Sequence, residues 1–320
     1  MAIYDCFTFY NEFELLELRL ELLYPVVDYF VICECNKTQR GDDKPFYFAE
    51  NKERFTKYLD KIINIQLTDP PTISQQRARS NGKVFAGEWD IENYQRNGVM
   101  RGLVDCKPED IIMISDLDEI PDPDIVAHIL DCKVSFLSAA ALGVRGYLRM
   151  LSFTHVFAKE KTIVRRILRH RELQVRDLLD NRIPVALELD MRYYFLNCTA
   201  GYHWRRSSLT YYKNMMMPQM MRDIGFQGGY VARAGWHLSY MGGLARIKKK
   251  MHSIVEGNDK IERDDAYIEQ CLREGKDLFG RKGPMFTYRF LQRDEISIPH
   301  ADEFIERYPY LYREPEEEVD

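Results

Sequence analysis

The first third of the chain alternates short apolar runs with stretches of helical character. Residues 2–9 are rich in aromatic and branched side chains, which predicts a strand, and residues 11–24 carry Leu and Phe at helical density. Residues 26–34 predict a second buried strand, residues 51–58 a charged helix, and residues 62–67 a third strand. This alternation of strands and helices predicts a parallel, doubly wound sheet.

The fourth predicted strand has the clearest end. Residues 89–103 have the spacing of a helix with one apolar face, and residues 110–115 (DIIMIS) are then mostly branched and apolar. That run stops abruptly at Asp116 and Asp118. An apolar run that ends in acids is typical of a central strand whose carboxyl end opens on a ligand site. We therefore expect these two acids to lie in the functional site.

Beyond residue 122 the pattern is less regular. No internal repeat or low-complexity linker interrupts the chain, so we predict one large α/β domain. The further predicted elements are strands at residues 134–142, 192–196 and 236–239, and helices at residues 244–255 and 264–274.

Composition and charge exclude several classes of function. The 320 residues are 45% hydrophobic and 30% charged, as in ordinary globular proteins, and the net charge of -5 provides no attraction for nucleic acid. The sequence contains neither a secretory signal pattern nor an apolar stretch long enough for a membrane span. Its seven Cys are an odd number without metal-ligand spacing, which favours a reducing compartment. We expect a cytoplasmic protein without a nucleic-acid partner.

Asp116 and Asp118 have the spacing of a metal site. A loop after a strand can turn both carboxylates toward one cation, and Mg²⁺ and Mn²⁺ prefer oxygen ligands that are completed by water and substrate phosphate. The alternative is a solvated turn in which Asp118 or Glu119 caps a helix that follows Pro121. The position of the acids at the end of the most strand-like run favours the metal.

Blocks of residues along the chain resemble glycosyltransferase family 17. They occur in matching order over roughly residues 2–280, which is far more specific than any single block. The blocks are residues 5–12, 15–20, 27–32, 44–45, 47–48, 58–63, 95–97, 115–121 and 235–240.

The resemblance implies a fold, a donor and a reaction. The fold is of GT-A type, with a Rossmann-like, doubly wound and mostly parallel sheet in a single large domain. Residues 1–121 would form the nucleotide-sugar-binding half and residues 122–310 the acceptor-side half of a domain over residues 1–310, and residues 311–320 would be a polar tail. Family members use a UDP-sugar, a divalent cation (Mn²⁺ or Mg²⁺) and inversion at the anomeric carbon. One member adds N-acetylglucosamine to N-glycans, so we expect that sugar and a glycan acceptor.

The resemblance also assigns the metal ligands. In the GT-A pattern, Asp118 binds the cation directly, and Asp116 contacts the ribose or a metal-bound water. His237 resembles a late histidine that completes the metal shell in many such enzymes, and neutral imidazole suits Mn²⁺. The alternative for His237 is a histidine that is hydrogen-bonded between strands.

Besides Asp116, five residues are candidates for binding the donor. Glu12 and Glu34 each follow an early strand, where a doubly wound sheet meets a nucleotide, although Glu12 also suits the first turn of the next helix. Arg96 and Asn97 resemble an Arg-Asn pair that many GT-A enzymes place against the donor. Lys249 belongs to a basic patch that suits a diphosphate, and the alternative is a solvated helix face.

An inverting transfer also needs a base that deprotonates the acceptor hydroxyl. Glu256 directly follows the helix predicted at residues 244–255, which is rich in lysine. It is the leading candidate because family members often carry a glutamate after this helix. Glu119 is the second candidate, and its alternative role is to order the metal loop. A nucleotidyltransferase and an inactive sugar-binding relative are the other functions considered. The sequence has no P-loop, and retention of Asp116 and Asp118 argues against an inactive relative.

Overall fold

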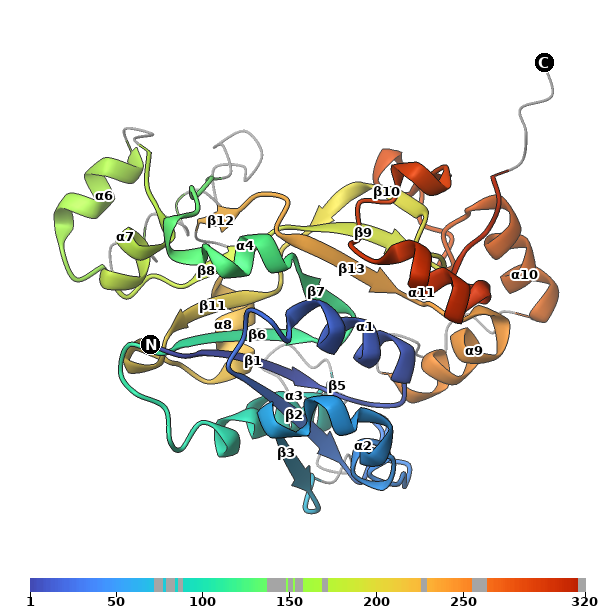
Figure 1. Cartoon of the computed structure of the whole chain (residues 1–320), viewed down its shortest axis with the longest axis horizontal. Coiled ribbons are helices and arrows are strands. Elements are labelled where there is room, and N and C mark those ends of the chain that lie inside the picture. The colour runs from blue at the N-terminus through green and yellow to red at the C-terminus, as the bar shows by residue number, and fades with distance from the viewer. Residues whose placement is uncertain are drawn as a thin grey trace.

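The computed structural model of the chain describes residues 1–71, 77–78, 84–85, 89–136, 148, 152, 158–168, 172–225, 229–254 and 264–315. Within them, two mixed sheets and the helices that cover them form the body of the protein (Figure 1). The larger sheet has seven strands, in the order β12 (Tyr230–Val231), β8 (Val185–Leu187), β11 (Ser208–Tyr211), β6 (Ile111–Asp116), β1 (Ile3–Thr8), β2 (Tyr29–Cys35) and β3 (Ile62–Leu67).

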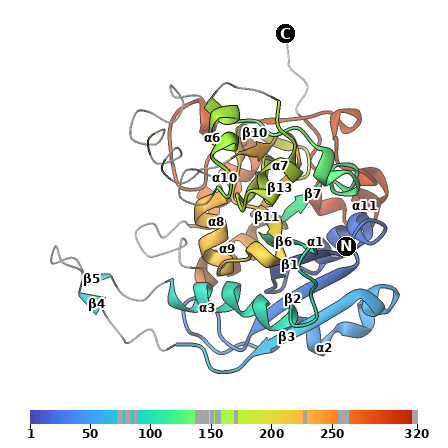
Figure 2. The same cartoon turned by 90° about the vertical axis from the view of Figure 1, so that its left-hand side faces the viewer.

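The second sheet comes from the later part of the chain, apart from one short strand after the acids. Its order is β14 (Tyr288–Phe290), β10 (Cys198–Trp204), β9 (Leu189–Tyr193), β13 (Gly235–Ser239) and β7 (Glu119–Pro121). A two-stranded sheet lies apart from both larger sheets (Figure 2) and consists of β4 (Arg77–Ala78) and β5 (Val84–Phe85).

The predicted α/β class is confirmed, and so is the parallel arrangement of the first four predicted strands. β1 pairs in parallel with both β2 and β6, and β3 extends the same parallel set beyond β2. The large sheet is mostly parallel, as predicted, since β12 and β8 are also parallel and β11 alone among its strands runs antiparallel to its neighbours, β6 and β8. The prediction of a single sheet is wrong, because the later strands form a second, mixed sheet. Strand direction follows from the connections, which a periodic pattern of side chains does not encode.

The strands predicted beyond residue 122 agree with the structure to different extents. β13 contains the predicted residues 236–239, and β9 overlaps the strand predicted at residues 192–196. Of the strand predicted at residues 134–142, Ser135 forms an isolated bridge with Tyr230, and residues 137–142 lie outside the described residues.

The predicted helices are present, with shifted ends. The helix predicted at residues 51–58 is a 3₁₀ helix. The helices and 3₁₀ helices are α1 (Phe13–Leu23), α2 (Tyr47–Glu50), η1 (Lys52–Lys61), α3 (Asp90–Gly98), η2 (Val99–Gly102), α4 (Pro123–Ala127), η3 (Ile129–Asp131), α6 (Lys161–Leu168), α7 (Val175–Asp180), η4 (Tyr212–Asn214), α8 (Pro218–Gly225), α9 (Gly243–Ser253), α10 (Asp265–Glu274), η5 (Pro284–Phe286), η6 (Arg293–Glu295), α11 (Ala301–Arg307) and η7 (Pro309–Leu311).

The parallel half of the large sheet is covered on both faces. Alternate side chains of a strand point to opposite faces, and accordingly Phe7 joins a cluster with the leucines of α1, whereas Cys6 joins a cluster with Ile91 of α3 and Val99 of η2. The first cluster continues into the second sheet and includes Trp236. Burial on both faces explains why the strands of this half read as continuous apolar runs.

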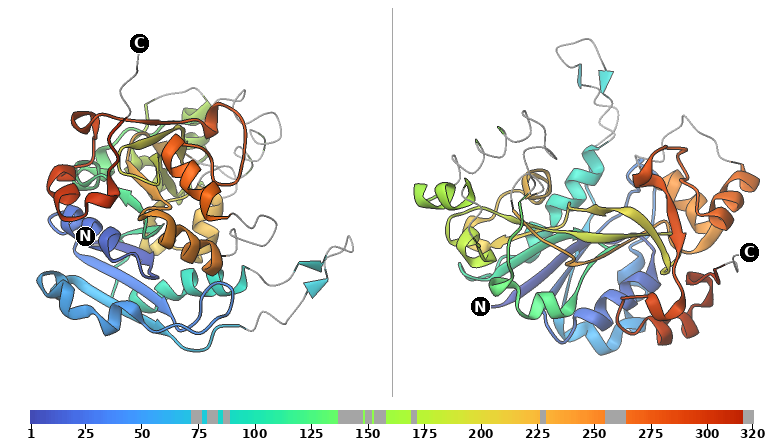
Figure 3. Two further views of the ribbon diagram at one scale, coloured as in Figure 1. Left: turned by 90° about the vertical axis from the view of Figure 1, so that its right-hand side faces the viewer. Right: turned by 90° about the horizontal axis from the view of Figure 1, so that it is seen from above.

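The end of the chain returns to its beginning. α11 lies beside α1 (Figure 3), and Leu311 is buried in the same cluster as the α1 leucines. Asn197 hydrogen-bonds to the backbone of Arg313 in both directions, so the structure places the start of the predicted polar tail against the second sheet. Residues 316–320 lie outside the described part.

Among the described residues, no helix is long and apolar enough to cross a membrane. All seven cysteines belong to the described part, and all are free thiols.

Candidate active site

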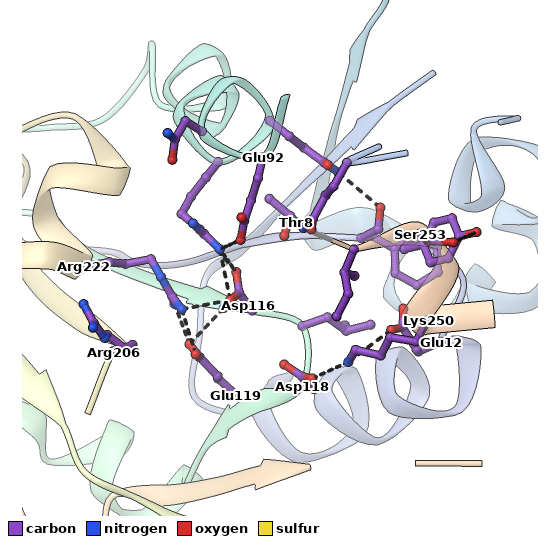
Figure 4. Close-up of a pocket in the computed structure, with 18 of the residues that line it drawn as sticks. Thr8, Glu12, Glu92, Asp116, Asp118, Glu119, Arg206, Arg222, Lys250 and Ser253 are labelled. Carbon is purple, nitrogen blue, oxygen red and sulfur yellow. Dashed lines mark hydrogen bonds and ion pairs between the residues drawn. The ribbon is translucent and has the colours of Figure 1, made fainter. Parts of the chain in front are cut away.

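A cleft of about 580 Å³ opens at the carboxyl ends of β1, β2 and β6 (Figure 4). It is the position at which open α/β sheets bind ligands. The loop of residues 116–119 forms its floor, and α3, α8, β13 and α9 supply side chains to its walls. The cleft therefore combines groups from both sheets.

A buried arginine of α1 holds this acid loop in place. Arg19 is fully buried, and its Nη1 donates to the backbone oxygens of Asp116, Leu117 and Glu119 over 2.8–3.0 Å. Its Nη2 donates to the carboxylate of Asp5 on β1 over 2.6 Å. Because a buried guanidinium needs both a counter-charge and acceptors, this network fixes the turn that carries the acids.

Asp116 faces two guanidinium groups. Arg96 Nη2 lies 2.9 Å from Asp116 Oδ1, and Arg222 Nη2 lies 2.8 Å from Asp116 Oδ2. Arg96 is held in turn by Glu92, one turn earlier on α3, over 2.7 Å. Both oxygens of Asp116 are thus already engaged by positive charge.

Glu119 is the most completely bonded acid of the loop. It is fully buried, and its two oxygens accept hydrogen bonds from Trp204, Ser207, Arg222 and the backbone N–H of Asp116. Burial opposes ionisation, but Arg222 outweighs it and lowers the pKa of Glu119 to about 2. A carboxylate so acidic and so fully bonded is a poor proton acceptor. This geometry suits the second role considered for Glu119, which is to order the loop.

Asp118 lies in a different environment, on the other side of the loop. Lys250 Nζ of α9 is 2.8 Å from Asp118 Oδ2 and 3.6 Å from Glu12 Oε1. His237 Nε2 of β13 is 3.6 Å from Asp118 Oδ1. Burial disfavours the charged carboxylate, but Lys250 and His237 outweigh it and hold the pKa of Asp118 well below its usual range.

The position of His237 follows from the strand pairing. His237 is the partner of Glu119 in the antiparallel pair of β13 and β7, so the histidine and the acid loop are linked through the backbone. Its ring lies 4.9 Å from the ring of Trp204. Its Nδ1 atom is buried and forms no hydrogen bond with any described residue. Nε2 is thus the ring nitrogen beside Asp118, and Nδ1 has no partner among the described residues.

Two donors at this spacing suit a cation that a ligand helps to hold. No group of three or more His, Cys, Asp or Glu side chains in the described part could bind a metal by itself. Asp118 and His237 lie close enough to share one divalent ion, since each ligand bond is about 2.1 Å long. Mg²⁺ is commonly held by one or two carboxylates together with substrate phosphates. Asp118 and His237 therefore fit a divalent cation whose remaining ligands come from water or a bound ligand.

Comparison with known proteins gives the family. The sequence model of "Glycosyltransferase family 17" matches residues 1–175, more than half of the chain. The chain belongs to this family. Over 126 residues it is 33% identical to the human "Beta-1,4-mannosyl-glycoprotein 4-beta-N-acetylglucosaminyltransferase" and 32% identical to the rat protein of that name. These matches cover 37% of this chain but only 22% and 21% of the two relatives, so the chain matches about a fifth of their length.

The predicted site residues of this family 17 protein separate into two groups. Six of them line the cleft, namely Glu12, Arg96, Asp116, Asp118, Glu119 and His237. Asn97 is instead used between helices, because its side chain accepts from the backbone N–H of Gln219 on α8. Lys249 lies over the rings of Tyr10 and Tyr47 and borders a smaller neighbouring cavity. Glu256 lies outside the described residues.

Glu34 is not among the described residues that line the cleft, in contrast to the prediction for it. Its carboxylate is buried beneath α2 and accepts hydrogen bonds from the backbone N–H groups of Phe48 and Ala49 over 2.7 and 3.1 Å. Burial raises the pKa of Glu34. The first N–H groups of a helix have no partner within the helix, which explains why an acid occupies this position at the start of α2.

Sequence reasoning missed Arg222, Trp204 and Arg19. Arg222 is a single basic residue in a methionine-rich stretch, and only the fold shows that it reaches Asp116 and Glu119. Trp204 was not among the predicted site residues, and its Nε1 donates to Glu119. Arg19 offered the one available signal, because a charged residue interrupts the buried leucine face of α1.

Proposed function

We propose that this protein transfers N-acetylglucosamine from a UDP-sugar to a hydroxyl group of a glycan acceptor, with inversion at the anomeric carbon and on a GT-A type fold. Membership of the family and the activity named for its relatives support the transfer reaction. Nucleotide sugars such as UDP-N-acetylglucosamine carry an α-linked sugar. A β-linked product, as in the relatives' name, therefore requires inversion.

The observation that carries the proposal is the pair Asp116 and Asp118 at the carboxyl end of β6, in a cleft lined by both signs of charge. A nucleoside diphosphate is an anion, and positive side chains on the walls would oppose its charge. They are Lys37, Lys44, Arg96, Arg206, Arg222 and Lys250.

We further propose that the two acids divide the work. Asp118 and His237 would hold Mn²⁺ or Mg²⁺, and that cation would neutralise the charge of the departing diphosphate. Arg96 and Arg222 already occupy both oxygens of Asp116, so we assign Asp116 to the ribose side rather than to direct metal binding.

In the reaction, the acceptor oxygen forms a bond to the anomeric carbon while the bond from that carbon to the phosphate oxygen breaks. UDP leaves with the bonding electrons, and the hydroxyl proton passes to a base. We retain Glu256 as the proposed base. Glu119 is the weaker candidate, because its oxygens accept five hydrogen bonds and its pKa lies at about 2.

The test is a panel of nucleotide sugars incubated with glycan acceptors, with release of UDP as the measurement. We expect release from UDP-N-acetylglucosamine with Mn²⁺ and little release with a chelator. Calorimetry should show tighter UDP binding with metal, because the acids alone would repel the diphosphate. Equal affinity with and without metal would contradict the metal role. Formation of a nucleotide sugar with pyrophosphate release would instead indicate a nucleotidyltransferase.

A further inference from the structure

Lys250 occupies the position beside Asp118 at which a metal ion would bind. Its Nζ is 2.8 Å from Asp118 Oδ2 and 3.6 Å from Glu12 Oε1, and it lies 5.5 Å from the centre of the Tyr240 ring (Figure 4). The side chain of Lys250 is 20% exposed and that of Asp118 is 12% exposed. A carboxylate this deeply buried requires a counter-charge, and in this structure the ammonium group supplies it.

We propose that Lys250 is an internal counter-cation that a divalent ion must displace from Asp118, so that metal binds tightly only together with a nucleoside diphosphate. This inference rests on the proposed function and adds a positioning residue to it.

The charges around Asp118 explain the coupling. Two carboxylates, Asp118 and Glu12, face one ammonium, Lys250, with the ring of His237 beside them. A divalent cation added alone would give the group an excess of positive charge, and it would repel the ammonium at short range. A diphosphate that arrives with the cation removes that excess. It also offers Lys250 a new partner, so the lysine does not lose its ion pair.

The local structure lets the lysine move without disturbing the fold. Lys250 lies in the last turn of α9, and its head group sits on a flexible four-carbon stem. A cavity of about 20 Å³, bordered by Glu12, Lys249 and Lys250, adjoins the cleft. That space is enough for about one water molecule, so a small change of the stem is possible.

The same helix provides a matched control. Lys248 is two residues earlier and pairs with Asp265 at the surface, where the two side chains are 42% and 57% exposed. Replacing Lys248 removes the same charge from the same helix without touching Asp118.

The experiment measures Mn²⁺ binding by electron paramagnetic resonance for the full chain, Lys250→Met and Lys248→Met, with and without UDP. Without UDP, Lys250→Met should bind Mn²⁺ at least about tenfold more tightly than the parent, because the competing charge is gone. The factor by which UDP increases Mn²⁺ affinity should shrink by a similar amount. Lys248→Met should match the parent in both measurements.

Thermal unfolding guards against a purely structural effect. Lys250→Met leaves Asp118 without its counter-charge, so the thermal midpoint of this variant should fall. Mn²⁺ alone should raise the midpoint of the variant by more than it raises the midpoint of the parent. If Lys250→Met does not fold, Lys250→Gln removes the charge and keeps a hydrogen-bond donor, and the same two measurements apply.

Unchanged or weaker Mn²⁺ binding by Lys250→Met and Lys250→Gln without UDP would overturn the inference. Failure of the proposed function would look different. In that case neither the parent nor the variants would bind UDP, whereas Mn²⁺ would still bind more tightly to Lys250→Met than to the parent.

Discussion

The loop of residues 116–119 directs three carboxyl groups, which the sequence presents as one acidic run, into three different surroundings. Asp116 faces Arg96 and Arg222, Asp118 faces Lys250 and His237, and Glu119 faces inward. These different surroundings arise from residues that are distant in sequence. The acids could therefore be identified from their position after a strand, but their individual partners could not.

Glu119→Gln should destabilise the protein. It removes the negative charge opposite Arg222, and loss of one member of a buried ion pair typically costs about 3–5 kcal/mol of unfolding free energy. Denaturant unfolding at neutral pH measures this loss. Glu172→Gln is the control, since Glu172 pairs with Lys133 at the surface, and it should leave the denaturation midpoint unchanged.

The pH dependence of stability provides a second measurement on the same residue. The pKa of Glu119 is about 2 in the folded protein and 4.5 in its ordinary state, so the unfolded chain binds a proton first as pH falls. Its stabilising contribution should be complete above about pH 4.5 and should decrease as pH falls toward 2. Glu119→Gln should show a shallower loss over this range, and an identical slope in both proteins would contradict the assignment.

Asp118→Asn and Glu256→Gln should separate metal binding from acceptor activation. Asp118→Asn keeps the shape but removes a ligand charge, so Mn²⁺-dependent UDP binding and turnover should fall together. Glu256→Gln should bind UDP and Mn²⁺ nearly as the parent does, yet transfer sugar about 10²–10⁴-fold more slowly if it is the base. Transfer by Glu256→Gln at close to the parent rate would exclude Glu256.

Some residues predicted to bind the donor are bonded to other groups of the protein. Glu34 follows a strand, as a nucleotide contact would, but it satisfies the start of α2. Arg96 lines the cleft, and it is buried and paired with Asp116. Burial and hydrogen-bond partners of this kind depend on the packing of distant elements, which one sequence does not reveal.

Among the elements, those with one strong periodicity were predicted best. β3 matches its predicted residues 62–67, and β6 is shifted by a single residue from residues 110–115. Apart from β10, which has seven residues, the strands of the second sheet have three to five residues, so their limits and directions were harder to predict. β7 has three residues, and the turn before it was interpreted only as a loop.

The pairing of β7 with β13 connects the acid loop to His237, and it depends on Gly235. Gly235 has φ of 141°, and a Cβ there would overlap with the carbonyl oxygen of Ile120 on β7. Gly235→Ala should therefore separate the two strands, which would lower stability and move His237 away from Asp118. Mn²⁺-dependent UDP binding and the thermal midpoint are the measurements.

Gly243→Ala is a control that separates the cost of a positive φ from the cost of the contact with β7. Gly243 also has a positive φ, of 77°, but a Cβ there would meet no atom within 4 Å. It should show only the conformational cost, about 1 kcal/mol, whereas Gly235→Ala should cost clearly more. Equal losses in the two variants would show that the contact with β7 has no role.

At the scale of the whole molecule, α1 is in contact with the C-terminal residues 307–310. Arg307 of α11 and Tyr308 both bond to Glu17 of α1, and Tyr310 bonds to Glu14. Glu14 also pairs with Arg246 of α9, the helix that carries Lys250. The C-terminal segment thus braces α1 and α9, which both supply groups to the cleft or to its loop.

A truncation series should show how far this brace extends. Deletion of residues 308–320 removes the Tyr308 and Tyr310 bonds and also Leu311, which is 1% exposed in the main apolar cluster. Loss of a buried leucine side chain alone costs about 2–5 kcal/mol, so the thermal midpoint should fall by more than about 5 °C. Tyr310 holds Glu14, and Glu14 pairs with Arg246 of α9. Loss of Tyr310 should therefore loosen α9, and Mn²⁺-dependent UDP binding should weaken as well. Deletion of residues 316–320 keeps all of these contacts and should change neither quantity. If the longer deletion melted and bound UDP as the full chain does, the C-terminal segment would have no part in holding the cleft together.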